Sequence, residues 1–292
     1  MKTHVYKRAE GYALSLDVYT PERVAAGIPA VVFLHGGALI WGSRKDVNPA
    51  ERAAVLEAGM AYVSVDYRLA PETNLTEICA DVKDALKWVR GEGARLYGFD
   101  PEKVAVLGKS AGGYLALLSG TLSDPPNAVI SFYGYGDLLG EWYTLPSSHY
   151  LKQPLVPRED AARCVQQGTP TYAARETRWP LYLHTRQTGD WARWTTGYGK
   201  EEAATALLPF CPIQNIRPGY PPTLLLHGSS DTDVPVEQSI SMHAALKDAG
   251  IDARLLIQPE GGHGFDATWE NTAEGFGIVT GFLRDQFGDI QG

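Results

Sequence analysis

Short apolar runs and amphipathic stretches alternate along most of this 292-residue chain. The opening is expected to form strands, because every second residue of Tyr12–Tyr19 is apolar, which is the period of a half-buried strand. After a turn at Pro21–Pro29 the apolar runs become continuous and are bounded by Gly, Pro or Asp. Such runs are typical of parallel strands covered on both faces. They lie at residues 30–34, 61–65, 104–107, 128–130, 223–226 and 253–257.

Helical patterns separate these runs. Pro49–Gly59 opens with proline and closes with glycine, as helices often do. Residues 78–90 carry an apolar stripe beside charged positions. Further helices are expected at 114–118, 236–249 and 276–287. The alternation of strand and helix predicts an α/β protein with a doubly wound, mostly parallel sheet.

Residues 136–218 interrupt this alternation, because they contain several prolines, many aromatic residues and no clear apolar β-run. We predict a helical cap here, between a first core part at 1–135 and a second at 219–292. Its aromatic residues either line an apolar pocket or pack the cap onto the core. They are Trp142, Tyr143, Tyr150, Tyr172, Trp179, Tyr182, Trp191, Trp194 and Tyr198. Its arginines include candidates for a carboxylate anchor, although most are expected in solvent.

The strongest local signal for chemistry is Gly108-Lys109-Ser110-Ala111-Gly112, which follows one predicted strand and precedes a helix. This G-x-S-x-G spacing places a serine on a tight turn, where side chains at the two glycines would clash. The turn exposes the hydroxyl of Ser110. A chance Gly/Ser turn gives the same letters, but the flanking strand and helix favour a nucleophile.

A second glycine motif, His35-Gly36-Gly37-Ala38, directly follows the strand at 30–34. Acyl transfer needs hydrogen-bond donors for the oxygen that becomes negative in the tetrahedral intermediate. We therefore predict an oxyanion hole formed by the backbone N–H groups of Gly36, Gly37 and Ala111. The alternative is an ordinary glycine turn after a strand.

The remaining partners of a hydrolytic triad follow later strands. Asp231 lies just after the run at 223–226, and His263 lies in a glycine-rich loop before the last helix. The chain order Ser, Asp, His is that of α/β-hydrolases. Asp233 competes with Asp231 for the role of the acid. His35 and His227 belong to glycine motifs, whereas His4, His149, His184 and His243 lack a suitable loop.

These pieces together resemble the hormone-sensitive-lipase-like branch of the α/β-hydrolases. The resemblance rests on His35-Gly36-Gly37, on Trp41-Gly42-Ser43 and on residues 65–72, Val-Asp-Tyr-Arg-Leu-Ala-Pro-Glu. It implies that Arg68 and Glu72 fix the loop beneath the oxyanion hole. The C-terminal motifs around Asp231 and His263 are similar to those of carboxylesterases and prolyl-oligopeptidase-like enzymes. That similarity implies that Asp231 is the acid of the triad.

One residue departs from the pattern of the branch, which commonly has an acid before the nucleophile where this chain has Lys109. Lys109 either contacts an anionic substrate or pairs with a neighbouring carboxylate at the surface. We expect Ala38, Trp41, Lys109, Trp142 and Tyr143 to bind substrate.

Composition narrows the functional classes. A net charge of −8 argues against nucleic acid and anionic membranes as partners. Three scattered cysteines and the absence of an apolar leader segment favour a cytoplasmic protein. No metal or cofactor is expected, and a homodimer remains open.

The sequence thus predicts a serine esterase that cleaves a carboxylic ester of a small to medium, apolar or aromatic substrate through an acyl-enzyme. A peptidase or amidase, and a lactonase or tailoring hydrolase of secondary metabolism, are alternatives within the enzymes. A receptor-like binding protein that kept the fold is the alternative outside them.

Overall fold

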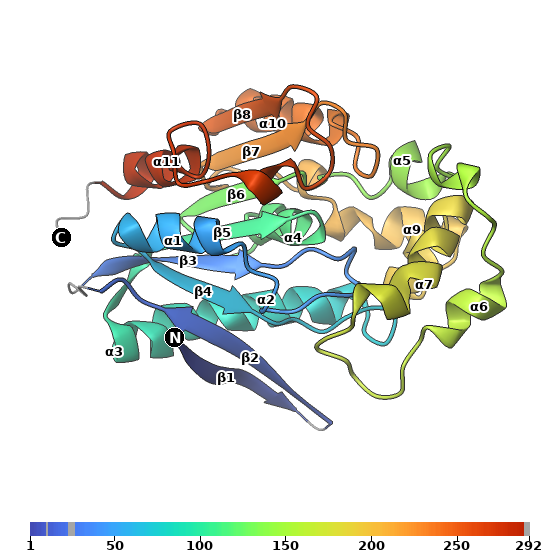
Figure 1. Ribbon diagram of the computed structural model, residues 1–292, viewed down its shortest axis with the longest axis horizontal. Coiled ribbons are helices and arrows are strands. Elements are labelled where there is room, and N and C mark those ends of the chain that lie inside the picture. Colours follow the sequence, from blue (N-terminus) through green and yellow to red (C-terminus); the bar gives the residue numbers. More distant parts are fainter. Residues whose placement is uncertain (10, 23–26, 289–292) are drawn as a thin grey trace.

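A computed structural model of the chain describes residues 1–9, 11–22 and 27–288. Eight strands form one sheet in the order β1-β2-β4-β3-β5-β6-β7-β8 (Figure 1). β1 pairs antiparallel with β2, which pairs antiparallel with β4, and all other pairs are parallel. The strands are β1 Lys2–Ala9, β2 Tyr12–Tyr19, β3 Ile28–Leu34, β4 Ala61–Val65, β5 Phe99–Lys109, β6 Ala128–Phe132, β7 Thr223–Gly228 and β8 Ala253–Gln258. The predicted doubly wound, mostly parallel sheet is confirmed, while residues 23–26 of the predicted turn lie outside the described residues.

The central strands are covered on both faces, which explains their continuous apolar sequences. In β3, Val32 points into one hydrophobic core, whereas Val31 and Phe33 point into another. Successive side chains of a strand face opposite sides of the sheet, so one apolar run supplies both cores. Helices α1 Pro49–Glu57 and α11 Gly277–Phe287 cover one face, and α2 Leu75–Trp88, α4 Ala111–Ser119 and α10 Glu237–Asp248 cover the other.

Local sequence signals fix where these helices begin. The side chain of Asn48 accepts a hydrogen bond from Ala50 N at the start of α1. Asn74 and Glu77 form a capping box at the start of α2, in which each side chain bonds the other residue's backbone N–H. After α2 the chain continues through a π-helical turn, η1 Val89–Gly93, into α3 Ala94–Tyr97.

Residues 136–218, which we call the cap, run between β6 and β7 and hold short helices rather than strands of the sheet. Figure 1 shows these helices beyond the ends toward which β3 and β4 run. They are α5 Glu141–Thr144, α6 Arg158–Arg163, α7 Arg175–Thr188, α8 Trp191–Thr196 and α9 Lys200–Ala206, with 3-10 turns η2 Tyr150–Lys152, η3 Leu208–Phe210 and η4 Pro212–Gln214.

A buried ion pair connects the cap to the core. Arg178 on α7 is fully buried and lies 2.8 Å from the carboxylate of Glu72. Arg68, by contrast, pairs with Asp81 and Glu77 of α2. Arg68 thus ties the loop at residues 65–72 to α2, and Glu72 ties it to the cap. Tyr67 of the same loop donates its hydroxyl to His35 O over 2.8 Å.

Candidate active site

Ser110 occupies the sharp turn between β5 and α4. Its φ of 55° lies in the left-handed region, which non-glycine residues seldom adopt, so the surrounding structure must impose it. A Cβ at Gly108 would lie 2.0 Å from Gly112 O, and a Cβ at Gly112 would lie 2.0 Å from Leu34 O. Both glycines are therefore required for the backbone to reverse here, as the sequence motif indicates.

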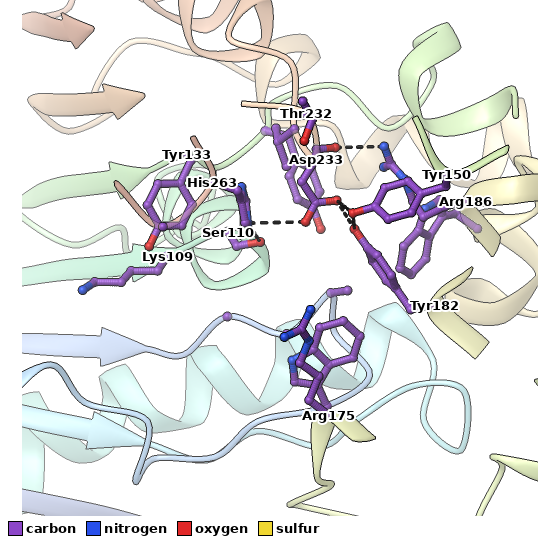
Figure 2. A pocket seen from close by; sticks show the side chains of 18 of the residues that line it. Lys109, Ser110, Tyr133, Tyr150, Arg175, Tyr182, Arg186, Thr232, Asp233 and His263 are labelled. Carbon is purple, nitrogen blue, oxygen red and sulfur yellow. Dashed lines mark hydrogen bonds and ion pairs between the residues drawn. The ribbon is translucent and has the colours of Figure 1, made fainter. Parts of the chain in front are cut away.

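The loops after β7 and β8 bring Asp231 and His263 to Ser110, although 153 residues separate the serine from the histidine. His263 Nε2 lies 3.0 Å from Ser110 Oγ, and His263 Nδ1 lies 2.8 Å from Asp231 Oδ2. Because the strands are parallel, their carboxyl ends meet at one edge of the sheet, which is how distant loops converge. The three residues predicted as a triad thus form one hydrogen-bonded chain, of which Figure 2 shows Ser110 and His263.

The geometry also separates Asp231 from Asp233. Asp231 is fully buried, and its Oδ1 accepts hydrogen bonds from the backbone N–H groups of Asp233 and Val234. Asp233 does not contact the Nδ1 side of the ring, since its Oδ2 lies 3.7 Å from Nε2. Asp231 is therefore the residue placed to orient His263.

The other histidines have structural surroundings. His227 is buried between Ser239 Oγ and Val234 O. His35 is buried with its ring stacked on Tyr67, at a centroid distance of 4.2 Å. His184 contacts Val156 O, and His243 contacts Ala253 O. Only the His263 ring contacts Ser110 among the histidines of the described residues.

The pKa shifts of Asp231 and His263 suit a histidine that accepts the proton of the serine. Burial raises the pKa of Asp231, but its bonds with His227 and His263 outweigh this effect and lower the pKa below its ordinary value. Burial lowers the pKa of His263, yet the bond to Asp231 and the charge of Asp233 more than offset it, so the pKa is raised. Asp231 therefore stays ionised and stabilises the imidazolium form of His263.

The predicted oxyanion donors surround the serine. A Cβ at Gly36 would lie 3.4 Å from Ser110 Cβ, so this loop packs directly against the nucleophile turn. Gly37 has a φ of 106°, and a Cβ there would lie 2.2 Å from Trp41 O. Ala111 is the first residue of α4, where backbone N–H groups lack intrahelical partners. The structure brings all three residues to Ser110.

A cavity of about 540 Å³ lies above Ser110 and His263, between the core and the cap. The predicted binding residues Ala38, Trp41, Lys109, Trp142 and Tyr143 all line it. Six of the nine aromatic residues singled out in the cap line the cavity as well, whereas Tyr172 and Tyr198 are exposed. The cap aromatics therefore form the cavity wall and also pack among themselves, as in the stacked pair Tyr143 and Trp191.

Sequence reasoning missed several other residues that line the cavity. Tyr133 and Tyr135 directly follow β6, where the ends of parallel strands were a usable signal. Asp46 and Thr232 also line the cavity, and nothing in their local sequence indicates it. Most of the cap arginines are exposed, as expected, whereas Arg178 and Arg186 are buried. Arg175 and Arg186 line the cavity.

Lys109 is largely buried rather than a surface lysine. Its Nζ lies 2.7 Å from Glu51 and 2.5 Å from Asp266, and Asp266 also accepts a hydrogen bond from the hydroxyl of Tyr133. Burial lowers the pKa of Lys109, but the two carboxylates outweigh it and raise the pKa. The ammonium therefore carries a charge that two protein carboxylates compensate. The Tyr133 ring in turn lies against His263, with centroids 4.6 Å apart (Figure 2).

In the described part of the chain, no three His, Cys, Asp or Glu side chains are grouped to hold a metal ion. Cys79, Cys164 and Cys211 are free thiols. None of the described helices is long and apolar enough to cross a membrane.

The parallel sheet, the serine turn and the convergent loops define an α/β-hydrolase. The chain matches the BD-FAE family model over residues 16–246, which is most of its length. It therefore belongs to the BD-FAE family, an esterase-like family of α/β-hydrolases. This assignment supports a hydrolase, whereas membership of the hormone-sensitive-lipase-like branch stays a prediction.

Solved structures agree with this fold. Esterase 2 of Thermogutta terrifontis, bound to propionate, superposes with a TM-score of 0.68 at 25% identity, covering 100% of this chain and 96% of that one. The same esterase phosphonylated by sarin superposes at 0.69 with 26% identity, covering 100% and 96%. A Staphylococcus aureus protein with unknown function superposes at 0.76 with 22% identity, covering 98% and 99%, and this likeness concerns the fold alone.

Curated relatives are much longer proteins. Non-reducing polyketide synthase trt4 of Aspergillus terreus is 31% identical over 316 aligned positions, which cover 91% of this chain and 13% of the synthase. Non-reducing polyketide synthase pkbA of Emericella nidulans is 29% identical, with 94% and 14% covered. The chain thus spans only about one seventh of the length of these relatives.

Proposed function

We propose that this protein is a carboxylic ester hydrolase that acts through an acyl-enzyme on Ser110. The observation that carries the proposal is the hydrogen-bonded chain from Ser110 Oγ through His263 to Asp231, with 3.0 and 2.8 Å separations, at the floor of a cavity. A serine hydroxyl is a weak nucleophile until an adjacent base accepts its proton. His263 is placed to be that base.

In the proposed reaction, Ser110 Oγ attacks the ester carbonyl while its proton moves to His263 Nε2. Asp231 holds the ring so that Nδ1 carries its proton, and it stabilises the imidazolium that forms. The N–H groups of Gly36, Gly37 and Ala111 bind the oxyanion. His263 then protonates the leaving alcohol, and water releases the acyl group. The proposed steps need no cofactor.

The cavity supports a small to medium, apolar or aromatic substrate. Its aromatic walls and its volume of about 540 Å³ suit one ring or a short chain. Esterase 2 of Thermogutta terrifontis has structures with propionate and with butyrate bound, which supports short acyl groups here. The features around His35 and residues 65–72 additionally support a place near the hormone-sensitive-lipase-like branch.

A second candidate is a tailoring hydrolase of secondary metabolism, favoured by the likeness to part of several polyketide synthases. In that case the acyl group would derive from a polyketide. Peptidase or amidase activity and lactonase activity remain alternatives. Comparing initial rates on a matched aryl ester, aryl lactone and aminoacyl anilide decides among them, and rates on the ester are expected to be highest.

The test of the mechanism is Ser110→Ala, assayed with p-nitrophenyl acetate and butyrate. We expect kcat/KM to fall by at least about a thousandfold, because the nucleophile is lost. Ser241→Ala, on the exposed side of α10, is the matched control and should keep full activity. Wild-type protein should also be labelled at Ser110 by a fluorophosphonate. A folded protein that neither reacts with the probe nor turns over esters would instead be a binding protein.

The cap boundaries at 136 and 218, a cytoplasmic location and a homodimer also belong to the proposal. Limited proteolysis, fractionation and light scattering would test them in turn.

A further inference from the structure

A second carboxylate faces the nitrogen of His263 that contacts the serine. Asp233 Oδ2 lies 3.7 Å from His263 Nε2, and the same Nε2 lies 3.0 Å from Ser110 Oγ. Asp233 lines the cavity, so the space in front of these atoms is open to substrate (Figure 2). The site therefore has one carboxylate on each side of the imidazole, with Asp231 at Nδ1 and Asp233 near Nε2.

The cap fixes the orientation of Asp233. Tyr150 of η2 donates its hydroxyl to Asp233 Oδ1 over 3.0 Å, and Tyr182 of α7 donates to the same oxygen. Arg186 donates from Nη2 to the backbone carbonyl of Asp233 over 2.9 Å. The backbone N–H of Asp233 is bonded to Asp231. Its position is thus set from two cap elements and from its own loop.

Only one of the two oxygens of the Asp233 carboxylate contacts the cap. Oδ1 makes both tyrosine contacts, whereas Oδ2 accepts no hydrogen bond from any residue in the described ranges 1–9, 11–22 and 27–288. The Asp233 side chain is 23% exposed and lines the cavity, so water or a ligand can reach Oδ2. A ligand that brings a donor to this point would satisfy it.

We propose that Asp233 is a further catalytic residue, which accepts a hydrogen bond from the water that hydrolyses the acyl-enzyme and thereby selects water over alcohols. This inference rests on the proposed function. The separation between Nε2 and Oδ2 allows one water to contact both, because each hydrogen bond spans roughly 2.8 Å.

The water oxygen attacks the carbonyl carbon of the Ser110 ester while one of its protons moves to His263 Nε2. The other hydrogen stays on the water oxygen and points to Asp233 Oδ2. The tetrahedral intermediate then collapses, the bond between the acyl carbon and Ser110 Oγ breaks, and Oγ regains a proton from His263. The products are the free acid and the original serine, and Asp233 exchanges no proton.

An alcohol cannot make both contacts. Its single hydroxyl hydrogen is needed by His263, so its alkyl group would have to lie beside the unpaired oxygen of Asp233. Burying a carboxylate oxygen against an alkyl group without a hydrogen bond is unfavourable. Water and methanol are nearly equal in size at the reacting oxygen, so this second hydrogen is the main difference between them.

The experiment measures how the acyl-enzyme partitions between the two acceptors. Enzyme is given p-nitrophenyl butyrate in buffer that contains methanol. Butyrate and methyl butyrate are then quantified by gas chromatography. Asp233→Asn keeps the size of the side chain. Its amide oxygen would accept from Tyr150 and Tyr182, so the NH2 group would face the cavity and replace an acceptor by a donor.

We expect the ratio of butyrate to methyl butyrate to fall about tenfold in Asp233→Asn, the loss of one hydrogen bond to a charged group. Tyr182→Phe, which removes one of the two phenols that orient Asp233, should lower the ratio about threefold, the loss of one ordinary hydrogen bond. Asp248→Asn makes the same chemical change on the exposed end of α10 and should leave the ratio unchanged.

The product ratio does not depend on how fast the acyl-enzyme forms or on the fraction of enzyme that is folded. A ratio within twofold of wild type in both Asp233→Asn and Tyr182→Phe would overturn the role of Asp233. If Asp233→Asn fails to fold, the Tyr182→Phe ratio alone decides. Fluorophosphonate labelling of Ser110 in each variant tests the proposed function separately, since a lost label would reject the acyl-enzyme itself.

Discussion

The ammonium of Lys109 lies 2.5 Å from the carboxylate of Asp266, so the residue before Ser110 is bonded to the third residue after His263. This ion pair joins the nucleophile turn to the histidine loop. Glu51 of α1 provides the second carboxylate, at 2.7 Å. The distance between the serine and the histidine thus depends on a buried network of charges as well as on the loops themselves.

Removal of the cation from this network should destabilise the fold. Lys109→Met would leave Glu51 and Asp266 as uncompensated buried charges, and breaking a buried pair in this way typically costs about 3–5 kcal/mol. We expect the free energy of unfolding, measured with urea, to fall by about that amount. Lys247→Met, at the exposed end of α10, is the matched control. Equal stability of the two variants would contradict this account.

The pH dependence should report the charges around His263. The base must be neutral, so kcat/KM rises with pH through the pKa of His263, which lies above its ordinary value of 6.5. Asp231 and Asp233 stabilise the imidazolium, and Arg186 opposes them. In Asp233→Asn one of these negative charges is lost, so the pKa falls and the acidic limb moves to lower pH. A limb that stays in place or moves upward would show that Asp233 does not act on the ring.

The loop at Gly37 should not tolerate a side chain. Gly37→Ala would place a Cβ 2.2 Å from Trp41 O on a backbone with φ of 106°, so the loop must shift. A displaced oxyanion donor costs about a hundred- to a thousandfold in kcat. Gly281→Ala, in α11 with open space around it, should keep its activity and gain up to about 1 kcal/mol of stability. Circular dichroism would establish that both variants are folded before their rates are compared.

The pair that anchors the cap should be strongly non-additive. Arg178→Met leaves Glu72 buried without its partner, and Glu72→Gln leaves Arg178 in the same condition. Each single change should cost about 3–5 kcal/mol, while the double variant should be more stable than either, because no lone charge stays buried. Urea unfolding of the four proteins completes this cycle. Simple addition of the two single effects would mean that the residues do not interact.

The strands and the turn that carries Ser110 follow from local sequence signals, because the residues that create them are adjacent in the chain. Gly108 and Gly112 frame Ser110 within five positions, and the apolar run at residues 30–34 directly marks a buried strand. β1 carries a weaker signal, since its residues are mostly exposed and show no clean alternation.

The remaining features depend on contacts between distant segments. Lys109 meets Glu51 and Asp266, which lie 58 positions before and 157 after it, so no local pattern shows that its charge is compensated. The orientation of Asp233 likewise depends on Tyr150 and Tyr182 of the cap. Sequence reasoning could rank the carboxylates of Asp231 and Asp233, but it could not assign a second role to Asp233.

The cap leaves the sheet after β6 and returns at β7, and these two strands are direct neighbours, with Val129 beside Thr223. An excursion that starts and ends side by side can be exchanged without altering the order of any strand. Replacing this segment with the matching segment of a relative would therefore change the binding cavity and leave the sheet intact, provided that the new segment has its own partners for Glu72 and Asp233.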